Sequence, residues 1–354
     1  MYNRSSGFLL IEFHQSRASQ ITFFSLLLLT YCTTLTGNFL IIILTWRSHH
    51  LHNPMYFFLV NLSFLEIWIT TTITPKFLSI LANGNRTISF WSCLVQCYIY
   101  FVLGSVEFIT LTMMSFDRYI AVCYPLRYKS IMNSQLCLYL IIGSWIGGII
   151  STLPQSFILP FLSFCGPNQL DHFFCDIEPL LKLVCADKRL INLLNLLISS
   201  VTVLGSLIVI TTSYIFIIRA VFKIPTGGDR WKSFSTCISH ILLVCIFYSG
   251  SVFMCLRFIK NSSVDFNKLA VILNTIITPL MNPFIYTLRN SQRDFVSPGY
   301  HWFSGDKLLL PFIDRDFVSP GYHWFSGDKL LLPFIDIHLY VALYLRYVWN
   351  PYAI

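Results

Sequence analysis

Seven long apolar runs divide the chain, and they restrict its fold more than any other feature of the sequence. The first run, Ile21–Leu44, is too long for the core of a signal peptide, and no small-residue cleavage pattern precedes Arg47. Runs of this length span a bilayer and must be helical, because a backbone amide finds no water in lipid. The six further runs are Met55–Leu81, Cys93–Val122, Leu136–Leu159, Leu193–Val221, Phe234–Phe258 and Leu269–Leu288.

Composition and charge agree with a membrane protein. Hydrophobic residues make up 55% of the chain and charged residues only 11%, whereas a soluble domain carries about 25% charged residues. The formal net charge of +8 reflects basic residues in the connecting segments and does not indicate nucleic-acid binding. Such residues mark the cytoplasmic side. They are Arg47, Arg118, Arg127, Lys129, Arg219, Lys223, Arg230 and Lys232.

The sequence therefore predicts an all-α membrane protein, a seven-transmembrane helix bundle with its N-terminus outside and its C-terminus inside. We expect an extracellular N-terminus over residues 1–20, the helix bundle over 21–288 and a tail over 289–354. The sequon at Asn3 is the best glycosylation candidate, because it lies in the outer segment.

Four of the eleven cysteines lie on the predicted outer side. The outer side is oxidising, so we expect disulfides there. Four cysteines allow three pairings, and their positions alone leave all three open. The four are Cys93, Cys165, Cys175 and Cys185.

Four local motifs occur in order along the chain. LHNPMYFFL opens the second span and MSFDRYIAVC ends the third, while KSFSTCISH opens the sixth and PLMNPFIY lies in the seventh. Together they resemble the odorant-receptor family of rhodopsin-like G-protein-coupled receptors, over about Phe8–Gln292. A seven-helix transporter is the rival interpretation, but it predicts broken helices in paired half-repeats, which the sequence lacks.

The resemblance implies a plasma-membrane receptor without enzymatic activity. Its partners would be a small volatile ligand, a stimulatory heterotrimeric G protein and the lipid bilayer. It favours the disulfides Cys93–Cys175 and Cys165–Cys185. It also assigns activation to one set of residues near the inner face, in which Asp117 restrains Arg118 at rest and Pro283 interrupts the seventh helix. The set is Asp117, Arg118, Tyr119, Tyr214, His240, Asn282, Pro283 and Tyr286.

Two carboxylates lie within spans, Glu66 in the second and Glu107 in the third. An ionised group at membrane depth is costly and usually functional. In a receptor of this class, Glu66 and Glu107 with Asn38 and Asn282 predict a sodium site that favours the resting state. The alternative is that these carboxylates are protonated and only hydrogen-bonded. No other cofactor is expected.

A ligand site should open in the outer half of the bundle. Five residues of the third span share one face, and the family pattern adds partners on the fifth, sixth and seventh spans. The outer half lacks a charge for an amine and a mid-span lysine for retinal, so we expect a neutral, mostly apolar ligand with one hydrogen-bonding group. The candidates are Tyr100, Phe101, Gly104, Ser105, Phe108, Asn195, Ser199, Thr202, Tyr248, Ser251, Cys255, Ile272 and Thr275.

The tail departs from the family pattern, which continues with a short basic amphipathic helix. Residues 293–314 are repeated without change as residues 315–336. A solenoid needs three or more repeats, so we interpret this pair as a recent duplication or an error in the gene model. A product that does not signal is therefore the alternative to a working receptor.

Overall fold

The computed structural model describes residues 7–10, 17–47, 53–165, 168–223, 228–256, 268 and 271–290. The chain divides into two units, Met1–Ile285 and Tyr286–Ile354. All contacts given below lie within the first unit. The predicted glycosylation site at Asn3 and the repeated tail segment lie outside the described residues.

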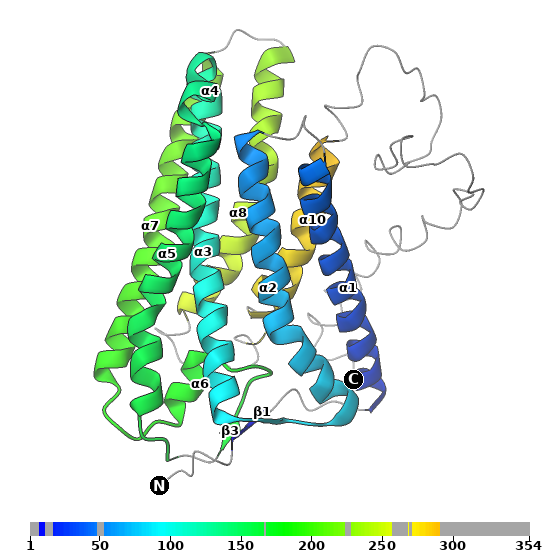
Figure 1. Ribbon diagram of the computed structural model, residues 1–354, viewed down its shortest axis with the longest axis vertical. Helices are drawn as coiled ribbons and strands as arrows, with labels where there is room; N and C mark the ends of the chain where they lie inside the picture. The colour runs from blue at the N-terminus through cyan, green and yellow to red at the C-terminus, as the bar shows by residue number, and fades with distance from the viewer. Residues whose placement is uncertain are drawn as a thin grey trace, which may run out of the picture. The chain divides into compact units, whose positions relative to one another are not determined.

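Seven long helical segments follow the seven apolar runs in the described residues, and their ends differ from those of the runs by a few residues (Figure 1). Short helices η2 (Pro125–Arg127), α4 (Tyr128–Ile131), η3 (Leu159–Phe161) and α6 (Ile177–Lys182) lie between them. The long segments are α1 (Arg17–Arg47), α2 (Pro54–Asn83), α3 (Phe90–Cys123), α5 (Ser134–Ile158), α7 (Arg189–Phe222), α8 (Gly228–Leu256), and η4 (Leu273–Ile277) running into α10 (Thr278–Asn290).

Five of these segments are long and apolar enough to cross a membrane: α1, α2, α3, α5 with η3, and α7. α8 contains a shorter apolar stretch, His240–Val252. A helix rises about 1.5 Å per residue, so even the 25 residues of α5 exceed the roughly 30 Å of a hydrocarbon core.

Capping residues explain where several helices begin and end. Ser89 accepts a hydrogen bond from the Ser92 amide at 3.2 Å at the start of α3, and Asn133 accepts one from Leu136 at 2.8 Å at the start of α5. α2 ends at Gly84, whose φ of 64° is a left-handed conformation that glycine adopts without strain. Polar residues at these ends therefore satisfy backbone groups that the helices leave open.

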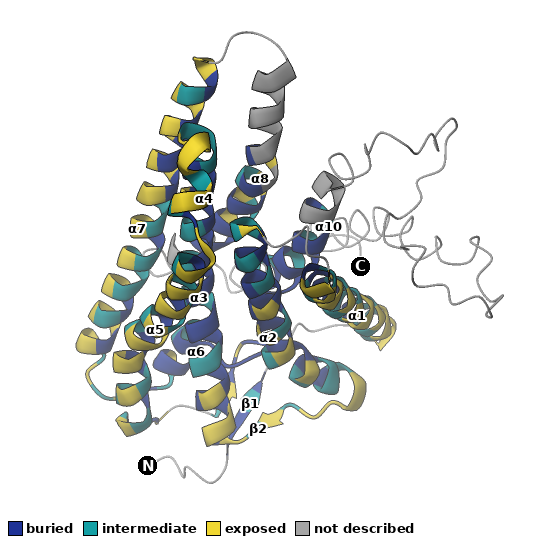
Figure 2. Ribbon diagram, turned by 45° about the horizontal axis from the view of Figure 1, so that its top comes forward, coloured by how far each residue is buried: buried dark blue, intermediate teal, exposed yellow. Residues whose placement is uncertain are grey.

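α3 is the central helix, packed against α2, α5, α7 and α8. Figure 2 marks exposed residues in yellow along α1, α5 and α7, and many of these residues are large and apolar, including Phe39, Ile142 and Ile208. Buried positions meanwhile include carboxylates and amides. Apolar residues outside and polar residues inside are the pattern of a protein surrounded by lipid.

A small sheet on the predicted outer side was not expected from the sequence. β1 (Phe8–Leu10) pairs antiparallel with β2 (Thr87–Ile88) and parallel with β3 (Gln169–Leu170). Phe8 and Leu10 are buried, and the ring of Phe8 contacts those of Phe90 and Phe164 at 5.9 and 5.8 Å. The segment before α1 is thus anchored to both outer loops.

The seventh helical segment differs from a regular helix before the predicted proline. η4 is a π-helix of five residues, and α10 follows it with Pro283 in its interior. A Cβ on Gly37 of α1 would lie 3.0 Å from side-chain atoms of Pro283. The absence of a side chain at Gly37 therefore allows α1 to approach the proline closely.

Candidate ligand site and inner-face network

Disulfides hold the second outer loop over the bundle. The structure joins Cys93 at the start of α3 to Cys175, and Cys165 to Cys185. These are the two pairs that the resemblance favours. Between the cysteines and the helices, Phe173 stacks on Phe77 of α2 with ring centroids 4.7 Å apart. Phe174 meets the edge of Tyr100 at 5.0 Å.

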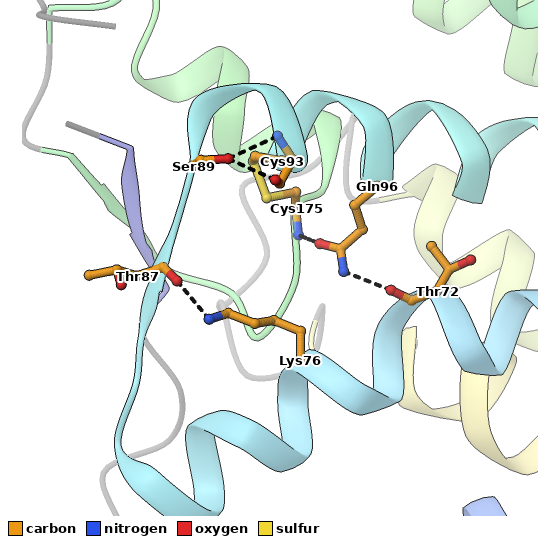
Figure 3. The surroundings of a disulfide bond; sticks show 8 residues. Thr72, Lys76, Thr87, Ser89, Cys93, Gln96 and Cys175 are labelled. Carbon is orange, nitrogen blue, oxygen red and sulfur yellow. Dashed lines mark hydrogen bonds between the residues drawn. A yellow bond between two sulfur atoms is a disulfide. The ribbon is translucent and has the colours of Figure 1, made fainter. Parts of the chain in front are cut away.

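Gln96, which the sequence analysis missed, fastens this loop to two helices (Figure 3). Its Oε1 accepts a hydrogen bond from the Cys175 amide at 3.0 Å, and its Nε2 donates to the Thr72 carbonyl of α2 at 2.8 Å. Lys76, one turn along α2, donates to the Thr87 carbonyl at 2.6 Å. The position of this glutamine, one turn inward of Cys93, is the sequence feature that could have predicted the contact.

The predicted face of α3 borders open space. Although α3 is central, Phe101, Gly104, Ser105 and Phe108 keep part of their surface exposed, while Tyr100 is buried beneath Phe174. A Cβ on Gly104 would meet no atom within 4 Å in the described part of the chain. These residues recur at helical spacing, so the space lies along one face of the helix.

α7 and α8 supply polar groups at the same depth. Asn195 is buried, and Ser199 and Thr202 are half-buried on α7. The Tyr248 hydroxyl of α8 donates to Ser206 Oγ at 2.5 Å, and its ring meets the edge of Phe108 at 5.4 Å. The structure therefore joins the candidates Tyr248 of α8 and Phe108 of α3 and adds Ser206, which lies one turn beyond Thr202.

The remaining candidates are placed differently. Ser251 is buried on α8, and its hydroxyl and the amide of Asn274 form a 3.0 Å hydrogen bond. Ile272 and Thr275 are buried in the seventh segment, where the Thr275 hydroxyl donates to its own helix, to the Val271 carbonyl, at 2.7 Å. The side chain of Cys255 lies outside the described set.

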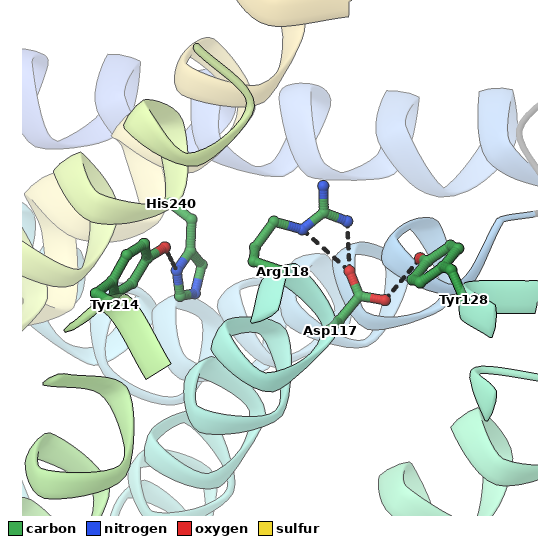
Figure 4. A network of polar contacts seen from close by, with 5 residues as sticks. All are labelled: Asp117, Arg118, Tyr128, Tyr214 and His240. Carbon is green, nitrogen blue, oxygen red and sulfur yellow. Dashed lines mark hydrogen bonds and ion pairs between the residues drawn. The ribbon is translucent and has the colours of Figure 1, made fainter. Parts of the chain in front are cut away.

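At the inner end of α3, Asp117 and Arg118 form a buried ion pair (Figure 4). Arg118 Nε and Nη2 both donate to Asp117 Oδ2, and the Nε bond is 3.0 Å long. Tyr128 of α4 donates to Asp117 Oδ1 at 2.7 Å, a contact that sequence reasoning missed. Burial, and next the charge of Asp117, raise the pKa of Tyr128, so its hydroxyl stays protonated and donates.

Two further activation residues pair across α7 and α8. Tyr214 and His240 are buried, with the hydroxyl 2.6 Å from Nδ1, and Figure 4 shows this pair with the Arg118 network. Tyr119 lies apart from that network, with its ring 5.9 Å from Phe216 of α7. The side chain of Tyr286 is not among those described.

The predicted sodium residues occupy the core between α1, α2, α3 and α10. Asn282 Nδ2 donates to Glu66 Oε1, and the two buried carboxylates Glu66 and Glu107 interact electrostatically. Asn38 is buried but donates to the carbonyls of Thr34 and Pro279, at 2.9 and 3.3 Å. Within the described ranges, Asn38 Oδ1, Glu66 Oε2 and Asn282 Oδ1 accept no hydrogen bond. Carboxylate and amide oxygens of this kind are the ligands that a hard cation prefers.

Comparison with known proteins points to one family. The family model described as Olfactory receptor matches residues 27–297. Olfactory receptor 6T1 of Homo sapiens is 44% identical over 291 residues, covering 82% of this chain and 90% of that receptor. Olfactory receptor 6E1 of Mus musculus is 45% identical over 286 residues, covering 80% of this chain and 91% of that receptor.

A solved structure shows the same fold. The crystal structure of squid rhodopsin superposes with a TM-score of 0.63 at 17% identity, covering 78% of this chain and 79% of that chain. The predicted seven-transmembrane helix bundle is confirmed by this likeness.

Proposed function

Because the chain belongs to the olfactory receptor family, we propose that it binds a small, neutral, mostly apolar volatile compound between α3, α7 and α8. Binding activates a stimulatory heterotrimeric G protein from the plasma membrane. Its activity is a change of conformation and involves no bond chemistry, so the protein is not an enzyme.

The main observation that supports the proposed ligand site is the open face of α3 at Gly104. A central helix normally has neighbours on every side, because protein interiors are closely packed. Aromatic rings on the same face and hydroxyls on α7 and α8 give a mostly apolar site with a few polar groups, which suits a small organic ligand.

Filling the open face should block the ligand without disturbing packing. In Gly104→Leu the new side chain meets no described atom within 4 Å at its Cβ, so we expect normal surface staining. Odorant potency in a cAMP assay should fall about tenfold or more, since the Leu occupies ligand volume.

Gly205→Leu is the matched control. Gly205 is also a helical glycine with open space at its Cβ, but it lies on the exposed side of α7. Potency there should stay unchanged. Equal potency of both variants and the wild type would place the ligand elsewhere.

Signalling is proposed to pass through the inner ends of α3, α7 and α8. Arg118 is held by Asp117, and Asp117 is held by Tyr128. A buried arginine without a partner is costly, so this network favours the resting arrangement. Motion of α8 would alter the Tyr214–His240 pair, which lies near Arg118 in Figure 4, and make the guanidinium accessible to the G protein.

We also propose that sodium favours the resting state by binding at Glu66, Glu107, Asn38 and Asn282. The oxygens of Asn38, Glu66 and Asn282 that accept no hydrogen bond from described residues support this. The alternative, protonated and hydrogen-bonded carboxylates, is supported by the burial of both Glu66 and Glu107, which interact electrostatically, because two buried like charges are costly.

Sodium titration of basal nucleotide exchange in isolated membranes separates the two. At constant ionic strength, sodium should lower basal exchange in the wild type and have no effect in Glu107→Gln, because the amide carries no charge to offset the ion. The control is Glu178→Gln, which alters a loop carboxylate paired with Lys182 at 2.9 Å. Identical sodium responses in the wild type and Glu107→Gln would exclude the ion site.

A product that does not signal remains the second candidate, and the unchanged repeat of residues 293–314 as 315–336 favours it. The physical reason is that the sequence after Asn290 departs from the family's basic amphipathic pattern, and a helix of that pattern anchors the end of the seventh span at the membrane surface.

A further inference from the structure

Asn195 has an amide that is buried and unused. The side chain is 3% exposed, and neither Oδ1 nor Nδ2 has a hydrogen-bond partner among the residues that the structure describes. Leaving both ends of an amide unpaired in the interior costs free energy. Such a group is therefore expected to meet a partner that the free protein lacks.

The position of Asn195 is set by contacts above and below it on α7. One turn outward, Ile191 packs in the buried hydrophobic cluster that contains Cys175 and Leu180. This cluster closes the outer end of the site and is called the roof. Eleven residues inward, about 16 Å along the helix, Ser206 is bonded to Tyr248, whose ring meets Phe108 of α3. That contact forms the floor.

Asn195 shares its face with Ser206 because eleven residues make almost three whole turns. Phe108 shares the open face of α3 with Gly104, which lies one turn outward. Asn195 thus lies between the roof and the floor, on the face of α7 that carries Ser206, whose partner Tyr248 contacts Phe108 on the open face of α3.

Charge limits what the amide can receive. Between the roof and the floor, α3, α7 and α8 carry no Lys or Arg, and the Lys268 ammonium lies in an ion pair with Asp171 at 2.7 Å. A carboxylate would therefore lose its hydration without gaining a cation in this part of the site.

We infer that Asn195 makes the receptor selective for ligands that carry a hydroxyl group, namely alcohols and phenols. The inference rests on the proposed ligand site. A hydroxyl donates to Oδ1 or accepts from Nδ2, and it can do both when the ligand lies across the amide. An ether or ester oxygen only accepts, so Oδ1 would remain without a donor.

The test compares medium-chain alcohols and phenols, each with its own methyl ether, in a cAMP assay normalised to surface staining. The wild type should respond to the alcohol at a concentration about tenfold or more below that for the ether, since the ether leaves a buried acceptor unpaired. Asn195→Leu should bring this ratio to about one. Asn195→Ser, which keeps a donor and an acceptor, should retain most of it.

Surface expression of Asn195→Leu should match the wild type, because the change removes an unpaired amide and adds little volume. Asn195→Val provides a second apolar variant for the same ratio if the Leu variant stays inside the cell.

An unchanged ratio in the apolar variants, or equal wild-type potency for alcohol and ether, overturns the inference. An unchanged ratio in the apolar variants is also the result expected if a buried water, and not the ligand, binds Asn195. Loss of response in Gly104→Leu together with an unchanged ratio in Asn195→Leu would leave the proposed function intact and reject only the role of Asn195. Full response in Gly104→Leu would reject the ligand site itself.

Discussion

Arg118 lies at the inner end of α3 with 6% of its surface exposed, in surroundings where a lone guanidinium would be costly. Its partner Asp117 is the preceding residue, so a local motif was enough to predict this pair. Tyr128 was not predictable in this way. It reaches Asp117 only because the short helix α4 folds back beneath α3.

Tyr128→Phe tests this network at the scale of one atom. Losing a hydrogen bond to a charged group costs about 1.5–3 kcal/mol, and the cost here falls on the resting arrangement of Asp117. We expect basal cAMP to rise about threefold or more with unchanged surface staining. Tyr139→Phe is the control, because Tyr139 is 68% exposed on α5. An equal rise in both variants, or none in Tyr128→Phe, would contradict a role for the hydroxyl.

At the scale of elements, two features depart from the seven regular helices that the apolar runs predict. One is the sheet β2–β1–β3, whose strands are too short and too far apart in sequence to give a periodic signal. The other is the π-helix η4, which precedes Pro283. η4 packs closely against α8, because a Cβ at Gly250 of α8 would collide with Asn274.

The strand β1 should contribute to stability through one face only. In Phe8→Ala, loss of a ring that is 1% exposed should destabilise the protein by about 3 kcal/mol. Leu9→Ala should cost much less, because Leu9 points to the other face and is half-buried. Thermal unfolding of the detergent-solubilised receptor measures both. Similar losses in the two variants would mean that β1 is not packed as described.

At the scale of the whole molecule, the receptor body and the tail carry different information. The family match ends at residue 297, shortly after the first copy of the repeat begins at residue 293. The assignment of residues 1–20, 21–288 and 289–354 to an outer segment, a bundle and an atypical tail stays a prediction. The receptor body supports the assignment to the family. We expect that the tail affects whether the receptor reaches the cell surface.

Replacing everything after Gln292 with the basic amphipathic tail of a related receptor tests that point. We expect surface staining and odorant-evoked cAMP to rise, because the new helix would anchor the end of the seventh span. The control carries the native tail with one copy of the repeat removed. Staining equal to that of the native chain in both would show that the tail does not limit expression.

The sequence by itself determined the number of spans, their approximate ends, their direction and the Asp117–Arg118 pair. These depend on hydropathy, loop charge and neighbouring residues, which are local properties of the chain. The outer cysteines and the polar residues within the spans could also be identified. Their disulfide and hydrogen-bond partners could not be derived from spacing.

Only the tertiary structure decided which side chains of different helices meet. It placed Glu66 against Asn282, 216 residues apart, opened the face of α3 at Gly104 and left the amide of Asn195 without a partner in the described chain. The physical reason is that helix packing sets these contacts. The rotation of each helix and the bulk of facing side chains decide them, and neither is fixed by the periodicity of a single span.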